Sequence, residues 1–215
     1  MTDISDFGSQ LIEWWGREGR RFPWRNTSDP FRIFLAEVLL HRTRATNVVP
    51  IYLKLLDSFS TPNELAQVNE KHLMDILSPL GLKWRNEMLL LTMRAIKREF
   101  DGKIPIDRDK LLSLPGVGDY IASATTVFTI NSDDPLIDTN TVRVISRVYM
   151  LKITDSTRRS KTIRDKYSAL RNNSEPRSFG FSIIDLASLI CTSRLPDCDH
   201  CPVLNFCLTG CESLK

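Results

Sequence analysis

Four of the chain's five cysteines have a spacing typical of a metal site. All five lie between positions 191 and 211 of the 215 residues, whereas a disulfide framework would be spread through the fold and would be rare in a cytosolic protein. Cys191, Cys198, Cys201 and Cys207 are separated by six, two and five residues. Four thiolates so placed can hold a zinc ion or an iron–sulfur cubane, and the chemistry of the ligands does not choose between them. Cys211 is left over, and we expect it to be a free thiol.

A second motif is the run Leu114-Pro115-Gly116-Val117-Gly118, which stands between two apolar helical segments. Its glycines permit a tight turn and keep side chains off the turn surface. The amides of Gly116 and Gly118 are then exposed at the N-terminus of the next helix, where an anion such as a DNA phosphate is favoured. The alternative is an ordinary turn between two helices.

Two carboxylates are candidates for catalysis. Asp138 stands at the start of a predicted helix, where it is either a plain N-cap or a carboxylate whose negative charge takes part in chemistry. The two roles are compatible. Glu37 lies among apolar residues of another predicted helix, so we expect its carboxylate to be salt-bridged or to take part in the chemistry.

Four segments together resemble the helix-hairpin-helix (HhH-GPD) DNA glycosylases of the endonuclease III and MutY superfamily. The resemblance is greatest to archaeal thymine/uracil mismatch glycosylases and extends over residues 8–207; the segments are 21–25, 36–43, 114–118 and 136–144. It implies a monofunctional base excision repair enzyme that flips thymine or uracil, mispaired with guanine, out of double-stranded DNA and hydrolyses its N-glycosidic bond. It also implies that the four cysteines hold a 4Fe-4S cluster and that a monovalent cation, sodium or potassium, binds at the hairpin.

The resemblance assigns roles to individual residues. Asp138 matches the catalytic aspartate, Asn140 a residue that orients it, and Glu37 a residue that faces the base pocket. Tyr120 stands where bifunctional members carry a lysine, and a phenol cannot form the Schiff base that precedes strand cleavage. We therefore expect Tyr120 to stack on an extruded pyrimidine and the enzyme to leave an intact abasic site.

Other matched positions concern DNA binding and the scaffold. Either His41 or Arg42 is expected to fill the gap that a flipped base leaves, and the sequence does not decide between them. The hairpin residues Leu114 to Gly118 are expected to bind the DNA backbone. Asp185 matches an aspartate near the cluster helix, with a structural role.

Two other functions remain possible on the sequence. A MutY-like adenine glycosylase would act on adenine opposite guanine or 8-oxoguanine. Tyr120 argues against it, because a small serine there would suit that branch, and so does the lack of the extra C-terminal domain of typical MutY proteins. A non-catalytic helix-hairpin-helix DNA-binding protein would keep the hairpin and the cysteines but would not require Asp138.

The elements that position these residues are predicted to be helices almost throughout, which makes the fold all-α. Asp29-Pro30 predicts a helix start by N-cap and proline, and the helix is expected over 31–43. Residues 22–25 are expected to be extended. Further helices are predicted over 7–17, 47–59, 61–68, 70–77, 84–100, 107–113, 120–129, 140–150, 158–169 and 181–190.

The expected architecture has two lobes. Residues 27–134 would form a six-helix barrel lobe that contains the helix-hairpin-helix motif (111–129). Residues 1–26 and 135–215 would form the iron–sulfur cluster lobe. We expect a cleft between the lobes to hold Tyr120, Asp138 and Glu37.

Composition sets the remaining expectations. The chain is 42% hydrophobic and 26% charged, as in globular proteins, and its net charge of +3 permits a nucleic-acid partner without requiring one. No apolar run reaches the roughly 18 residues of a membrane span, and the polar N-terminus does not resemble a signal peptide. We expect a monomer that does not bind membranes, located in the cytoplasm of a prokaryote in association with the nucleoid.

Overall fold

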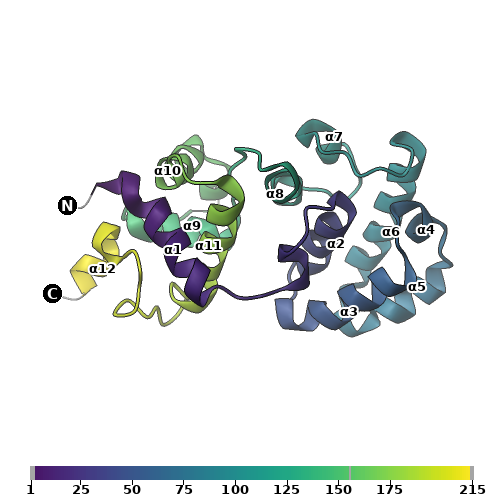
Figure 1. Ribbon diagram of the computed structural model, residues 1–215, viewed down its shortest axis with the longest axis horizontal. Coiled ribbons are helices and arrows are strands. Elements are labelled where there is room, and N and C mark those ends of the chain that lie inside the picture. The colour runs from purple at the N-terminus through teal and green to yellow at the C-terminus, as the bar shows by residue number, and fades with distance from the viewer. Residues whose placement is uncertain (1–2, 155, 214–215) are drawn as a thin grey trace. The chain divides into compact units, whose positions relative to one another are not determined.

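The structure, a computed structural model, describes residues 3–154 and 156–213, and for 211–213 the backbone only. Within these residues all regular structure is helical (Figure 1), which confirms the all-α prediction. No helix of the described part is long and apolar enough to cross a membrane. The chain divides into two compact units, residues 21–130 and residues 1–20 together with 131–215. We predicted the boundaries four to six residues further along, at 26/27 and 134/135.

The unit 21–130 is built around one buried helix, α2 (Pro30–Leu40), in which every residue from Ile33 to Leu39 is buried. The Asp29 carboxylate accepts the Arg32 N–H at 2.8 Å and caps this helix, as its sequence predicts. Helix α2 packs against α3 and α8, and α4 packs against α6. The helices are α2, α3 (Ala45–Ser58), α4 (Pro62–Gln67), α5 (Glu70–Leu77), α6 (Lys83–Glu99), α7 (Arg108–Leu112) and α8 (Asp119–Ile130), with 3-10 turns η2 (Pro23–Arg25) and η3 (Ser78–Leu80).

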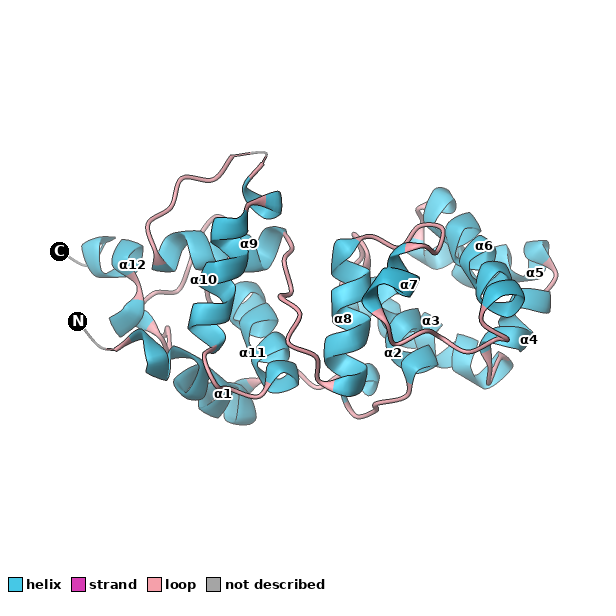
Figure 2. Cartoon of the chain, turned by 90° about the horizontal axis from the view of Figure 1, so that it is seen from above, coloured by secondary structure: helices cyan, strands magenta, loops and turns pink. Residues whose placement is uncertain are grey.

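The other unit brings the two ends of the chain together, with α1 packed against α11 and α11 against α9 (Figure 2). Phe7 of α1 contacts Phe179 of α11 and Phe206 of the C-terminal segment edge to face. The elements are η1 (Ile4–Asp6), α1 (Phe7–Glu18), α9 (Thr139–Val148), η4 (Thr157–Arg159), α10 (Lys161–Arg171), α11 (Pro176–Leu189), η5 (Leu204–Phe206) and α12 (Leu208–Ser213).

Asp185 is a fully buried carboxylate at the centre of this unit. It accepts hydrogen bonds from the indole Nε1 of Trp15 at 3.1 Å and the backbone N–H of Arg20 at 2.8 Å, and it forms an ion pair with Arg20 Nε at 2.7 Å. A buried carboxylate that is paired and hydrogen-bonded in this way ties α11 to the end of α1. Its position supports the structural role expected for it.

Two predicted helix boundaries and one predicted backbone conformation are wrong for identifiable reasons. Helix α2 ends at Leu40 and not at residue 43, because His41 leaves the helical region (ψ 112°) and Arg42 adopts a positive φ of 55°. Only Phe22 of the segment 22–25 is extended (φ −128°, ψ 149°), and the three residues after it form a 3-10 turn. Helix α11 begins at Pro176, five residues before the predicted start, because Glu175 caps it by accepting the Ser178 N–H at 2.6 Å.

Candidate active site and cysteine loop

The hairpin between α7 and α8 has the glycine-dependent geometry that its sequence predicts. Gly116 has φ 75°, and a Cβ atom at this position would lie 2.0 Å from Cγ of Met88 on α6. Leu114 and Val117 are buried, whereas Gly116 and Gly118 are exposed. The hairpin is therefore anchored by its two apolar residues and presents its glycine backbone to solvent at the start of α8.

Neighbouring side chains hold this hairpin in place. The Thr92 hydroxyl of α6 lies 2.6 Å from the Pro115 carbonyl oxygen, to which it donates. Asp119, the acidic residue at the start of α8, forms an ion pair with Arg108 of α7. The Arg108 guanidinium offsets the negative charge that Asp119 would otherwise present next to the exposed glycines.

Asp138 is the N-cap of α9. Its Oδ1 accepts the backbone N–H groups of Asn140 at 2.9 Å and Thr141 at 2.8 Å, and the Thr141 hydroxyl accepts the Asp138 N–H at 2.9 Å, which completes a capping box. Its Oδ2 accepts the side-chain amide of Asn140 at 2.8 Å. The carboxylate is thus held at the positive end of a helix dipole, with its second oxygen less fully occupied than its first.

A chain of hydrogen bonds leads from Asp138 to the first cysteine. The Asn140 side-chain oxygen accepts from Arg143 Nη1 at 3.1 Å, so the arginine fixes which way the amide of Asn140 points. The same guanidinium donates to the carbonyl oxygens of Cys191 at 2.9 Å and Ala187 at 2.8 Å. Asn140 therefore orients the Asp138 carboxylate while being oriented itself from the end of α11.

Arg147, one turn further along α9, directly contacts the segment 191–207 that carries the four cysteines, here called the cysteine loop. Its Nη1 donates to Cys191 Sγ at 3.2 Å and to the Thr192 carbonyl at 2.7 Å. The N–H of Gly210 points at Cys207 Sγ at 3.3 Å. N–H groups and a guanidinium aimed at sulfur stabilise thiolate charge, which is the form of cysteine that binds metals.

The four expected ligands act on one another electrostatically. Burial raises the pKa of Cys201 to about 12, and the charges of the three other cysteines contribute. Burial likewise raises the pKa of Cys198 and of Cys207, and the charge of Cys191 adds to both shifts. These raised pKa values favour the neutral thiols, and a bound cationic metal centre would favour the thiolates in their place.

The sulfur atoms of these four cysteines do not form a complete set of metal ligands in the structure. In the described part of the chain, no three His, Cys, Asp or Glu side chains are placed to hold a metal ion together. The assignment of Cys191, Cys198, Cys201 and Cys207 as ligands accordingly stays a prediction. The side chain of Cys211 lies outside the residues that the structure describes.

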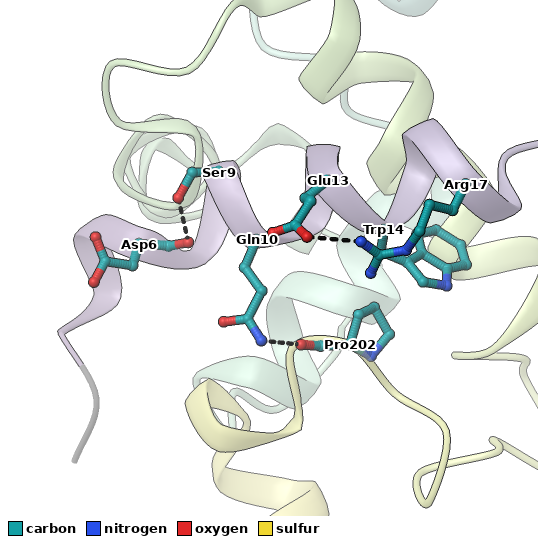
Figure 3. Close-up of a pocket in the computed structure, with 7 residues that line it drawn as sticks. All are labelled: Asp6, Ser9, Gln10, Glu13, Trp14, Arg17 and Pro202. Carbon is teal, nitrogen blue, oxygen red and sulfur yellow. Dashed lines mark hydrogen bonds and ion pairs between the residues drawn. The ribbon is translucent and has the colours of Figure 1, made fainter.

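The loop after Cys201 is also tied to α1. The side-chain amide of Gln10 donates to the Pro202 carbonyl oxygen at 2.7 Å, beside a surface hollow that polar residues of α1 line (Figure 3). Glu13 and Arg17, which border the same hollow, form an ion pair with each other at 2.6 Å. The hydrogen bond of Gln10 thus links this face of α1 to the cysteine loop.

Glu37 and Tyr120 lie on two helices that pack together in the unit 21–130. Glu37 is only 5% exposed, in the middle of α2, and Tyr120 is half-buried near the start of α8 against the apolar core. Asp138 and Asn140 belong to the other unit. The cleft predicted to hold Tyr120, Asp138 and Glu37 would combine residues of both units and stays a prediction.

His41 and Arg42 form an exposed turn after α2. The His41 ring packs edge to face on Trp84, with centroids 5.4 Å apart. Partial burial lowers the pKa of His41, and the positive charges of Arg42 and Arg85 lower it further, which favours the neutral ring. Both side chains are accessible, and this exposure alone does not choose between them as the residue that replaces a flipped base.

Sequence reasoning missed three arginines that donate to backbone carbonyl groups near the predicted site residues: Arg85, Arg143 and Arg147. Arg143 and Arg147 follow Asn140 at intervals of three and seven residues, which places all three on one face of α9. That spacing was the available signal. Arg85 offers no such signal, because it lies at the start of a helix among other charged residues.

Comparison with known proteins agrees with this geometry. Residues 35–168 match the family described as "HhH-GPD superfamily base excision DNA repair protein". The chain is 35% identical to the thymine/uracil-DNA glycosylase of Pyrobaculum aerophilum, over 95% of this chain and 91% of that protein. It is also 35% identical to the thymine-DNA glycosylase of Aeropyrum pernix, over 93% and 92% of the two chains.

Among solved structures, a thermostable thymine-DNA glycosylase superposes with a TM-score of 0.88 and 27% identity. The match covers 98% of this chain and 97% of that one. The sequence matches and the structural superposition thus both extend over nearly the whole chain. This chain belongs to the HhH-GPD superfamily of base excision DNA repair proteins.

Proposed function

We propose that this protein is a monofunctional DNA glycosylase that hydrolyses the N-glycosidic bond of thymine or uracil paired with guanine. The observation that carries the proposal is the Asp138 carboxylate, held by three N–H donors at the start of α9. The relatives with 35% identity, which are thymine/uracil- and thymine-DNA glycosylases, support the choice of base.

Loss of the base leaves positive charge on the sugar, and a fixed carboxylate stabilises that charge without having to reorganise during the reaction. An ionised carboxylate offers about four acceptor positions, and the protein occupies three of those of Asp138. The remaining position is on Oδ2. This oxygen can face the sugar or accept a proton from the attacking water.

Tyr120 determines how the reaction ends. Strand cleavage would start with an imine between the protein and the abasic sugar, and a phenol cannot form one. We therefore expect the DNA strand to stay intact. The half-buried ring on α8 offers an aromatic face to an extruded pyrimidine. The buried carboxyl group of Glu37, on the neighbouring helix, would contact the polar edge of that base.

DNA would be bound through the hairpin and the turn after α2. The exposed backbone of Gly116 and Gly118 suits a phosphate, and His41 or Arg42 would fill the space that the base vacates. A monovalent cation at the hairpin stays a prediction.

The cysteine loop would bind a 4Fe-4S cluster through Cys191, Cys198, Cys201 and Cys207. When bound, the cluster supplies cross-links to a segment whose apolar content is too low to fold by itself. Arg147 would stabilise the Cys191 thiolate, and Arg143 would hold the backbone at Cys191 and at Ala187, four residues before it.

The test uses end-labelled duplexes that contain T:G, U:G, A:G or A opposite 8-oxoguanine, incubated with the protein and then heated with or without alkali. We expect cleaved strands from T:G and U:G duplexes after alkali only. Release of adenine alone would indicate the MutY-like alternative, and binding without cleavage would indicate a non-catalytic protein. Strand cleavage before alkali would contradict the monofunctional assignment.

A further inference from the structure

Arg85, at the start of α6, is a buried arginine whose hydrogen-bond acceptors are all uncharged. It is 2% exposed. Its Nη1 donates to the Thr43 hydroxyl at 2.7 Å, to the Leu39 carbonyl at 3.0 Å and to the His41 carbonyl at 3.4 Å. Its Nη2 donates to the Gly81 carbonyl at 3.3 Å. One guanidinium thus binds the backbone of two separate turns.

Both turns adopt backbone conformations that need support. Arg42 has φ 55°, and Gly81 and Leu82 have φ 64° and 51°. Residues other than glycine rarely adopt such angles, and they do so where the surroundings hold them. Arg85 contacts the chain on both sides of Arg42, through the His41 carbonyl and the Thr43 hydroxyl, so it holds the turn closed at that residue.

The carbonyl groups around Arg85 also stabilise the positive charge of its guanidinium. Carbonyl groups in the last turn of a helix lack intrahelical donors and carry the negative end of the helix dipole. The Leu39 carbonyl is one of these groups in α2. A guanidinium presents five donors in a rigid planar arrangement, which a lysine cannot reproduce.

The side chains of His41 and Arg42 are the exposed ones on this turn. The His41 ring rests against Trp84, which is itself 47% exposed. The backbone is therefore held from the inside by Arg85, while the residues that would enter DNA remain accessible.

The same helix supports the hairpin. Met88 of α6 lies against Gly116, and the Thr92 hydroxyl bonds the Pro115 carbonyl. Arg85 is one turn before Met88 on this helix. Helix α6 thus supports both the turn at 41–43 and the hairpin that is proposed to bind phosphate.

We propose that Arg85 is a positioning residue that fixes the 41–43 turn relative to the hairpin, so that His41 or Arg42 can replace the extruded base without first being ordered. The proposal rests on the proposed function and adds to it the residue that controls base extrusion. Arg85 does not touch the substrate in this scheme and acts through the turn.

The test compares two substrates for each variant under single-turnover conditions. One is a T:G duplex, in which the thymine must be extruded and replaced. The other carries the same thymine in a single-nucleotide bulge, which is already extruded and leaves no gap to fill. The ratio of the two rates measures the contribution of the turn, and 2-aminopurine beside the thymine reports extrusion by fluorescence.

Arg85→Met is expected to slow the T:G reaction by about ten- to a hundredfold, as small misplacements of positioning groups do. The bulge reaction should change by less than about threefold, since its chemistry is unaffected. Thr43→Val removes one acceptor only and should shift the ratio in the same direction by about threefold. Leu73→Ala is the control for loss of core packing, because it empties a fully buried site on α5, at a residue that belongs to neither turn.

Unchanged ratios in both Arg85→Met and Thr43→Val, or equal slowing of both substrates, would overturn the proposal. Thr43→Val by itself tests the role of the turn even if Arg85→Met does not fold. Failure of the parent protein to release a base from any duplex would refute the proposed function instead. An active parent whose variants keep its ratio would refute the role of Arg85 alone.

Discussion

Substitutions of Asp138 can separate its role as the cap of α9 from its proposed role as a charge in the reaction. In Asp138→Asn the side-chain oxygen can still accept the N–H groups of Asn140 and Thr141, which Oδ1 accepts in the parent. The new amide then faces the Asn140 amide, and the bond at 2.8 Å is lost. One such bond contributes about 1 kcal/mol. Asp138→Ala loses all three bonds, and loss of a cap costs about 1 kcal/mol, up to about 2.

The two variants should therefore melt close together. A loss of about 1 kcal/mol lowers the melting temperature of a chain of this size by about 2–4 °C. Their base-release rates should nevertheless both fall by about 100- to 1000-fold, the range found when one preorganised electrostatic group is removed from an active site. A few degrees of stability cannot produce that effect at 25 °C, where both variants stay folded.

The assay is single-turnover release of thymine from a T:G duplex at 25 °C, measured beside thermal melting. Asp29→Asn is the matched control, because it makes the same chemical change at the N-cap of α2, where the carboxylate accepts the Arg32 N–H. It should keep the parent rate. If Asp138→Asn released bases as fast as Asp29→Asn, Asp138 would be a cap and nothing more.

Three other predictions concern the hairpin, the turn after α2 and the cysteine loop. Gly116→Ala should lower the free energy of unfolding by about 1–2 kcal/mol in urea titrations, because φ is 75° and the added Cβ meets Met88, whereas Gly118→Ala, with open space around it, should change little. The pKa of His41 is lowered from 6.5, so the unfolded chain binds its proton more tightly. The stability of the parent relative to His41→Gln should therefore fall as the pH drops below about 6.5 and stay constant above it. Purified protein should contain iron and acid-labile sulfide in about equal amounts, lost together with a lower melting temperature on chelation, and zinc in their place would contradict the cluster.

Local patterns in the sequence were enough to predict most helices and the hairpin. Asp29-Pro30 predicted the start of α2, and Gly116 predicted a positive φ, because both features depend on neighbours in the chain. The end of α2 was not predictable in this way. The Leu39 carbonyl group at that end accepts a hydrogen bond from Arg85, which lies 46 residues further along the chain.

The candidate site was predictable where a residue's type determines its chemistry. A carboxylate at a helix start and four clustered cysteines can be recognised in the sequence. The spacing of Arg143 and Arg147 places them on the same face of α9 as Asn140 but does not show what they bind, since an arginine in a helix usually extends into solvent. Arg143 and Arg147 instead bind carbonyl groups and a sulfur atom at positions 187–193, through contacts that only the folded chain brings together.

Both units use an arginine to support a functional residue through backbone carbonyl groups. Arg85 holds the turn of His41 and Arg42, and Arg143 holds Asn140, which in turn holds Asp138. A planar guanidinium can bind several carbonyl oxygens at once, so it fixes a neighbouring segment in orientation as well as in position. Neither arginine carries out the proposed chemistry. Removing one of them should therefore weaken the reaction through misplacement, whereas removing the Asp138 carboxylate should eliminate the charge on which the proposed reaction depends.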